Sequence, residues 1–169
     1  MKSFINSFDV FISKEVNVAY KGRFRPKYPE KYKGDPTKII YRSSWELKMF
    51  RFVDEHPDVI WWASEEFIVP YLSPIDGRMH RYFPDVVLRK KLPSGGIETL
   101  MIEIKPKKQT MPPDISKRNA TPSGRISRRY INEVKTYGVN EAKWVAARKY
   151  CAERGWKFAV FTESELGIK

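Results

Sequence analysis

Hydrophobic and polar residues alternate with a period of two in the middle of the chain, a pattern that predicts β-strands. Within residues 97–105, IETLMIEIK, the last two isoleucines fall on one side of a strand, whereas Glu103 and Lys105 fall together on the other. Strand-like runs also cover residues 65–72 and 78–90, and clusters of Pro, Gly, Asp and Ser separate the runs. We therefore expect an antiparallel meander of three strands.

Helical spacing of apolar residues appears on both sides of this meander. A capping-box pattern, SSWE, begins at Ser43, and the apolar residues that follow predict a helix that ends near His56. Two further helices are expected within residues 128–155, the second of them capped by Asn140. The short apolar run 157–161 is expected to add a strand beside the meander.

Two stretches rich in Pro, Gly and basic residues show no sustained period. We interpret residues 1–39 as an irregular basic N-terminal arm, and residues 106–129 as a long basic loop. Residues 40–169 are expected to form a single domain. The order of elements predicts the mixed α/β class, with a twisted mixed sheet flanked by helices.

Composition narrows the kind of partner. The 169 residues carry a net charge of +12, which favours a polyanionic partner such as nucleic acid. No apolar run approaches the roughly 18–20 residues that span a bilayer, so we expect no membrane association. Cys151 is the single cysteine and there are two histidines, so a zinc site lacks ligands and a metal is expected to be held by carboxylates.

The positive charge is concentrated in the arm and in the basic loop. Residues 2–42 contain ten Lys or Arg against four Asp or Glu, and residues 105–129 contain eight against one. Such side chains suit the phosphates of double-stranded DNA better than base edges, which predicts strong salt dependence and weak sequence preference. The candidates for DNA binding are Arg23, Arg25, Lys107, Lys108, Lys117, Arg118, Arg125, Arg128 and Arg129.

The expected hairpin brings acidic residues together. With a turn centred on Ser94 and Gly95, paired positions add up to about 189, which places Asp85 near Glu103 and Lys105. Two carboxylates this close repel each other unless a cation lies between them, and oxygen ligands suit Mg²⁺, with Mn²⁺ as the alternative. A metal ion and an ammonium group at one point are suited to phosphodiester hydrolysis.

These residues spell a known pattern. Pro84-Asp85 followed by Glu103-Ile104-Lys105 resembles the motif of the PD-(D/E)xK nuclease superfamily. The segments KYKGDPTKIIYRSSWELK, WASEEFIVPYLSPIDGRMHRYFPDVV, MIEIKPKKQT and YINEVKTYGVNEAKWVAARKYCAERGW extend the resemblance to the head-completion nucleases of T-even-type tailed phages. This likeness covers about residues 20–168. At superfamily level the chain is also similar to the transposon endonucleases of the TnsA group.

The resemblance implies a restriction-endonuclease-like core and a magnesium-dependent deoxyribonuclease, with endonuclease and also exonuclease activity open. It implies that Asp85, Glu103 and the Ile104 carbonyl hold the metal, that Lys105 is the catalytic lysine, and that Glu46 is a helix carboxylate and a further candidate ligand. The expected role is phage head completion and head–tail joining after DNA packaging, with head, portal or neck proteins as partners. The expected location is the host cytoplasm during assembly or the head–neck vertex of the virion.

Alternatives remain at several positions. Glu65 or Glu66 could take the acidic role assigned to Glu46, and Glu46 could be only a helix cap. Glu103 and Lys105 could form an ordinary salt bridge on a solvated sheet face. The protein could then be a non-catalytic DNA-binding head or neck protein, and a transposon or recombination endonuclease is the enzymatic alternative.

Overall fold

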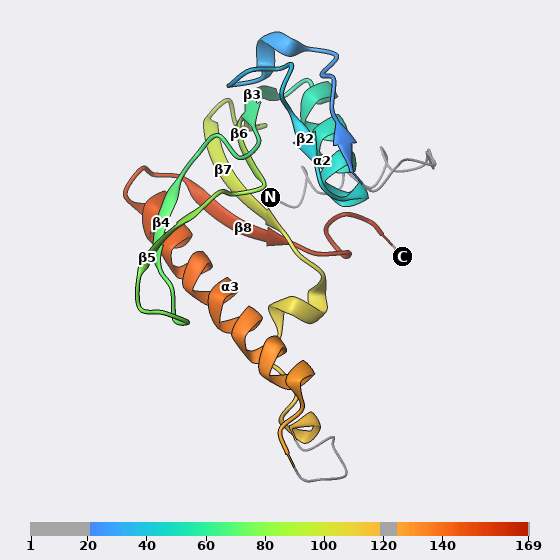
Figure 1. Cartoon of the computed structure of the whole chain (residues 1–169). Coiled ribbons are helices and arrows are strands. Elements are labelled where there is room, and N and C mark those ends of the chain that lie inside the picture. The colour runs from blue at the N-terminus through green and yellow to red at the C-terminus, as the bar shows by residue number, and fades with distance from the viewer. Residues whose placement is uncertain (1–20, 119–124, 169) are drawn as a thin grey trace.

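The computed structural model describes residues 21–118 and 125–168 and is built on a four-stranded sheet of order β3-β6-β7-β8 (Figure 1). Strand β6 (Val86–Lys91) pairs antiparallel with β3 (Val59–Ala63) on one side and with β7 (Ile97–Ile104) on the other. Strand β8 (Lys157–Phe161) runs parallel to β7, so the sheet is mixed. The expected mixed α/β class is confirmed, as is the strand expected at 157–161.

The two faces of the sheet are covered by different elements, as Figure 1 shows. Helix α2 (Ser44–Glu55) packs on the face that carries Leu88 and Ile102, whereas helix α3 (Arg128–Ala152) packs on the face that carries Val87 and Met101. Successive residues of β6 and β7 thus point to opposite cores, because side chains alternate along a strand. The paired segments Val86–Leu88 and Leu100–Ile102 are therefore apolar on each side.

The expected meander is wrong in its second strand, because the run 78–90 forms two strands, β5 and β6, that belong to different sheets. Strands β4 (Val69–Leu72) and β5 (Met79–Tyr82) pair only with each other and form a separate two-stranded sheet that lies against α3. The chain leaves this ladder at Phe83-Pro84, where proline has no N–H to donate to a partner strand. The outer antiparallel strand of the main sheet is β3, which the sequence reading did not assign.

The two helices expected within 128–155 are one continuous helix, α3, so the prediction of a helix start at Asn140 is wrong. Its N-cap is Ser127, whose hydroxyl accepts the N–H of Tyr130 at 3.1 Å. The helix continues through Gly138 because its buried stripe of Asn140, Trp144, Ala147 and Cys151 packs on the protein body. Tertiary contacts here outweigh the low helix propensity of glycine.

The described part of the basic arm is anchored to the body. Strands β1 (Gly22–Arg23) and β2 (Ile40–Tyr41) pair, and the short helix η1 (Pro29–Lys31) lies between them in sequence. Side chains of Phe24, Tyr32 and Ile39 are buried in the α2 core. Buried Asp54 accepts the backbone N–H of Lys27 at 2.7 Å. Residues 1–20 of the predicted arm lie outside the described residues.

The basic loop forms a projection that we call the stalk: residues 107–118 together with residues 125–137. It contains the short helices η2 (Lys107–Thr110) and η3 (Ile115–Lys117) and the first turns of α3, and it extends away from the sheet (Figure 1). Residues 119–124 of the loop lie outside the description. Among the described residues, no helix has the length and apolar character needed to cross a membrane.

Candidate active site

Asp85 lies where the chain passes from β5 to β6, next to the end of β7. The ladder pairs Val86 with Ile102, so one more step along it places Asp85 opposite Glu103. The side chain of Asp85 accepts the backbone N–H of Ile104 at 2.7 Å through Oδ2. The pairing is shifted by one residue from the expected register, and the convergence that the sequence predicts is present.

Glu103 is held from two sides. Its Oε1 lies 2.9 Å from the ammonium nitrogen of Lys105, and its Oε2 accepts the hydroxyl of Tyr82 at 2.6 Å. Glu103 is 2% exposed, whereas the Lys105 side chain is 25% exposed. The carboxylate is therefore fixed below the surface, and the ammonium group faces outward from it. Sequence reasoning missed Tyr82, which precedes Asp85 by three positions but belongs to a different sheet.

The surroundings of the acid pair shift the pKa values of Asp85 and Lys105. Burial raises the pKa of Asp85 well above its ordinary value, and the Glu103 carboxylate raises it further, against the opposing effects of Lys105 and the Ile104 N–H. Burial alone lowers the pKa of Lys105, but the carboxylates of Glu103 and Asp85 outweigh burial and raise it overall. Lys105 is thus a firmly charged ammonium group that serves two acids.

Two neighbouring carboxylates repel each other, and a divalent cation between them relieves that repulsion. Asp85 and Glu103 offer carboxylate oxygens, the ligands that Mg²⁺ and Mn²⁺ prefer. The donor set therefore fits such an ion. Within residues 21–118 and 125–168, however, no three His, Cys, Asp or Glu side chains are grouped as a metal site. Further ligands to an ion would have to be backbone carbonyls, water or substrate.

Glu46 forms the capping box that its sequence pattern predicts. The Ser43 hydroxyl accepts the Glu46 N–H at 3.1 Å, and the Glu46 carboxylate accepts the N–H of Arg42 at 2.7 Å. The expected partner was the N–H of Ser43, so the carboxylate reaches one residue further back. Glu46 also raises the pKa of Asp85, as the weakest of five influences, which places it in the electrostatic surroundings of the acid pair.

Glu65 and Glu66, the alternatives to Glu46, lie in the turn after β3 and not on a helix. Glu65 forms an ion pair with Arg42, and its N–H donates to the Pro84 carbonyl at 3.3 Å, directly beside Asp85. Glu66 instead accepts the hydroxyl of Tyr32 at 3.2 Å. The turn thus supports the position of Asp85, and Arg42 links it to the N-terminus of α2.

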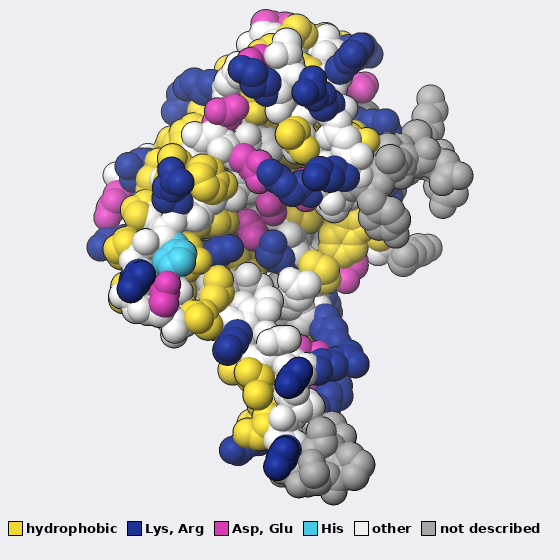
Figure 2. Space-filling view, in the orientation of Figure 1, with side chains coloured by type: hydrophobic (Ala, Val, Ile, Leu, Met, Phe, Trp, Pro, Cys, Tyr) yellow, Lys and Arg dark blue, Asp and Glu magenta, His cyan; other side chains and the backbone are white. Residues whose placement is uncertain are grey.

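The predicted DNA-binding residues fall into two groups. Arg23 and Arg25 are exposed beside α2, on the opposite side of the sheet from α3. The stalk carries the others, all exposed: Lys107, Lys108, Lys117, Arg118, Arg125, Arg128 and Arg129. Figure 2 shows basic side chains gathered along the stalk and acidic side chains in the middle of the same face of the molecule. The structure therefore does not bring all the candidates together.

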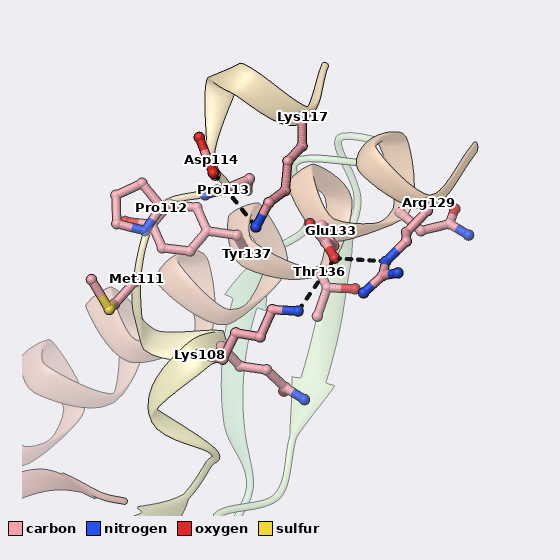
Figure 3. Close-up of a pocket in the computed structure, with 12 residues that line it drawn as sticks. Lys108, Met111, Pro112, Pro113, Asp114, Lys117, Arg129, Glu133, Thr136 and Tyr137 are labelled. Carbon is pink, nitrogen blue, oxygen red and sulfur yellow. Dashed lines mark hydrogen bonds and ion pairs between the residues drawn. The ribbon is translucent and has the colours of Figure 1, made fainter. Parts of the chain in front are cut away.

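A cavity of about 610 Å³ lies in the stalk, between the loop after η2 and the first turns of α3 (Figure 3). Met111, Pro112 and Tyr137 give it an apolar lining. On its rim Glu133 pairs with both Lys108, at 3.8 Å, and Arg129, at 3.3 Å. None of the lining residues belongs to the acid pair, so the cavity and the candidate active site are separate features.

Acids and a lysine converge at the ends of two sheet strands, in the arrangement of an endonuclease core, and comparison with known families agrees. Residues 56–163 match the family model described as the TnsA-like endonuclease N-terminal domain, and the chain belongs to this family. The matched range contains Asp85, Glu103 and Lys105 but begins after Glu46.

A curated relative shows a second family to which the chain is similar. The chain is 42% identical over 149 residues to the head completion nuclease of Enterobacteria phage T4, which covers 88% of this chain and 95% of the relative. The chain therefore also belongs to the family of this phage nuclease, and the expected resemblance is confirmed. No solved structure matches the chain.

Proposed function

We propose that this protein is a divalent-metal-dependent DNA endonuclease that hydrolyses phosphodiester bonds during phage head completion. The observation that carries the proposal is the convergence of Asp85, Glu103 and Lys105 at the end of β7, where the Lys105 ammonium group lies beside the buried Glu103 and the half-buried Asp85. Membership in the TnsA-like endonuclease family and the name of the phage T4 relative support the same activity.

The metal would be held by Asp85, Glu103 and the backbone carbonyl of Ile104, with Glu46 as a candidate ligand for a second ion. Mg²⁺ is the ion we expect, and Mn²⁺ is the alternative, because both favour oxygen ligands. When bound, such an ion polarises a phosphate oxygen and lowers the pKa of a water molecule. The carboxylates of the chain set where that chemistry takes place.

Lys105 is assigned the role of orienting the attacking water and steadying the phosphoryl oxygens. Glu103 holds the Lys105 ammonium nitrogen at 2.9 Å, and Tyr82 fixes the other oxygen of Glu103 at 2.6 Å, so the ammonium group has a defined position before substrate arrives. Water attacks phosphorus in line with the bond to the 3′ oxygen. That bond breaks and leaves a 5′ phosphate and a 3′ hydroxyl.

The biological setting follows from the T4 relative. A head completion nuclease acts on heads that are being finished, so we assign this chain to the trimming of packaged double-stranded DNA before heads join tails. Head, portal or neck proteins are the partners we propose. The site of action is the host cytoplasm during assembly, or the head–neck vertex if the protein stays with the virion.

The main rival is a non-catalytic DNA-binding head or neck protein, in which Glu103 and Lys105 form an ordinary surface salt bridge. Glu103 is 2% exposed, which does not fit a solvated sheet face. A buried glutamate beside a second, half-buried carboxylate is also an unfavourable arrangement for a purely structural role. The rival predicts DNA retardation on gels with no cleavage under any divalent ion.

The test is Asp85→Asn, assayed by cleavage of plasmid DNA with Mg²⁺ or Mn²⁺. Loss of the carboxylate should lower the cleavage rate at least about 100-fold, while the fold and DNA binding remain, because a neutral amide relieves the buried charge. Asp76→Asn is the matched control, since Asp76 pairs with His80 at the exposed tip of the β4–β5 hairpin. Full cleavage by folded Asp85→Asn protein would refute the assignment.

A further inference from the structure

Two buried hydrogen-bond donors on α3 have no partner among the described residues: Nδ2 of Asn140 and Nε1 of Trp144. Asn140 is 5% exposed and Trp144 is 2% exposed. A buried donor without an acceptor destabilises the folded state, whereas an apolar residue in its place carries no such penalty. Asparagine also has low helix propensity in a helix interior. Two donors of this kind, one helical turn apart, call for an explanation.

Contacts at two points show where these donors lie relative to β7. Toward the end of α3, Cys151 Sγ lies 3.8 Å from Met101 Sδ, and near its start Glu133 pairs with Lys108 at 3.8 Å. The helix and the chain from Met101 to Lys108 therefore run side by side in opposite directions. Asn140 and Trp144 belong to the same buried stripe as Cys151, between these two contacts.

The segment of chain between the same two contacts contains the acid pair's Glu103 and also Lys105. Met101 faces α3, and Glu103 and Lys105 follow it at intervals of two residues on the same face. Lys143, which lies between the two donors in sequence, places its ammonium nitrogen 5.6 Å from the centre of the Tyr82 ring. Tyr82 in turn donates its hydroxyl to Glu103. The donors thus lie on the part of α3 that borders the candidate active site.

We propose that Asn140 Nδ2 and Trp144 Nε1 bind a non-bridging phosphate oxygen of the DNA strand held at the acid pair. This inference rests on the proposed function and adds two substrate-binding residues to it. Both groups are neutral donors that accept no proton and repel no anion, and such donors hold an anionic oxygen well in a site that excludes water. They offset the repulsion that Asp85 and Glu103 exert on a phosphate.

Trp144→Phe and Asn140→Leu each remove a donor and keep most of the packing volume. Each is placed in the Asp85→Asn background, and its affinity for a DNA duplex is measured at fixed salt. Each should bind about 10- to 100-fold more weakly than Asp85→Asn alone, the effect of one hydrogen bond to a charged group. With Asp85 restored, the cleavage rates should fall with them. Val145→Ala, an exposed change on the same helix, is the matched control.

Thermal unfolding without DNA separates substrate binding from a structural role. A donor that serves the substrate predicts a melting temperature of Asn140→Leu equal to or above that of the parent protein, because an unpaired buried group has been removed at an equal number of side-chain heavy atoms. Trp144→Phe also leaves a small cavity, so its melting temperature is compared with its loss of DNA affinity. Melting temperatures that fall while DNA affinity stays unchanged would assign the donors to an internal water molecule and overturn the inference. Trp144→Phe keeps an aromatic ring in the core. If Asn140→Leu does not fold, the DNA affinity of Trp144→Phe alone tests whether the donors bind DNA.

The two proposals fail in different ways. If Asp85→Asn cleaves DNA normally, the assignment of the acid pair fails, although the affinity measurements on the α3 variants still stand. If Asp85→Asn is inactive and both α3 variants bind and cleave like the control, only the present inference is wrong.

Discussion

His56 shows how one side chain ties stability to pH. It follows the last residue of α2, its backbone N–H caps the helix on Phe52, and its Nδ1 accepts the N–H of Asp58 at 3.1 Å. An acceptor nitrogen carries no proton, so the fold selects the neutral imidazole. Burial lowers the pKa of His56, and the nearby Lys31 and Lys90 lower it further, against the opposing carboxylate of Asp58.

The expected result is a loss of stability as the pH falls from about 7 to below 6. The pKa of His56 in the folded protein lies below its value of about 6.5 in the unfolded chain. As the pH falls, the unfolded chain therefore takes up a proton before the folded protein does, and this shifts the equilibrium toward unfolding. The measurement is urea unfolding across this pH range. His56→Asn keeps an acceptor for the Asp58 N–H but does not titrate, and it should show a shallower slope. Equal slopes in the two proteins would contradict the assignment to His56.

The residues of the candidate site differ in how far sequence could reveal them. Asp85, Glu103 and Lys105 were predictable because a hairpin and a period of two are local rules, and a register error of one residue does not separate them. Tyr82 reaches Glu103 from another sheet, and Asn140 and Trp144 are placed by the packing of α3. No local pattern reports such contacts, so these residues needed the three-dimensional structure.

Elements show the same division between local and tertiary causes. The capping box and apolar spacing were sufficient to predict α2, whereas a glycine near an asparagine wrongly predicted a break in α3. The hairpin of β6 and β7 was predictable from its turn, but the pairing of β3 with β6 joins strands that are not consecutive along the chain and depends on tertiary packing. Sequence patterns define elements better than they define non-neighbouring partners.

Gly138 provides a test of the helix interior. Gly138 lies in the middle of α3, and its backbone does not adopt the left-handed conformation that favours glycine. A Cβ atom added to it would lie 3.8 Å from Pro74 Cγ, which is an ordinary van der Waals contact. Gly138→Ala should therefore raise the free energy of unfolding by about 0.5–1 kcal/mol, through helix propensity and a less flexible unfolded chain. Urea unfolding measures the change. A decrease would show that α3 needs glycine at this point for its packing on β4.

At the scale of the whole molecule, the predicted DNA-binding residues are divided between two surfaces. Glu103 and Lys105 point toward the side of the sheet that α3 covers, and the stalk includes the first turns of α3. Arg23 and Arg25 lie on the side that α2 covers. A DNA duplex held at the acid pair would therefore lie on the same side of the sheet as the stalk. The stalk cations are therefore expected to supply more of the DNA affinity than the arginines of the arm.

Salt dependence measures this division directly, because each phosphate contact contributes about 0.9 to the slope of log affinity against log salt. In the Asp85→Asn background, Arg118→Gln with Arg128→Gln should lower the slope by roughly 1–2. Arg23→Gln with Arg25→Gln removes the same charge and should lower it less, which makes the second pair a matched control. Equal losses would mean that DNA follows the surface around the edge of the sheet and contacts both sides. Losses confined to the arm would place the duplex on the α2 side and separate the stalk from DNA binding altogether.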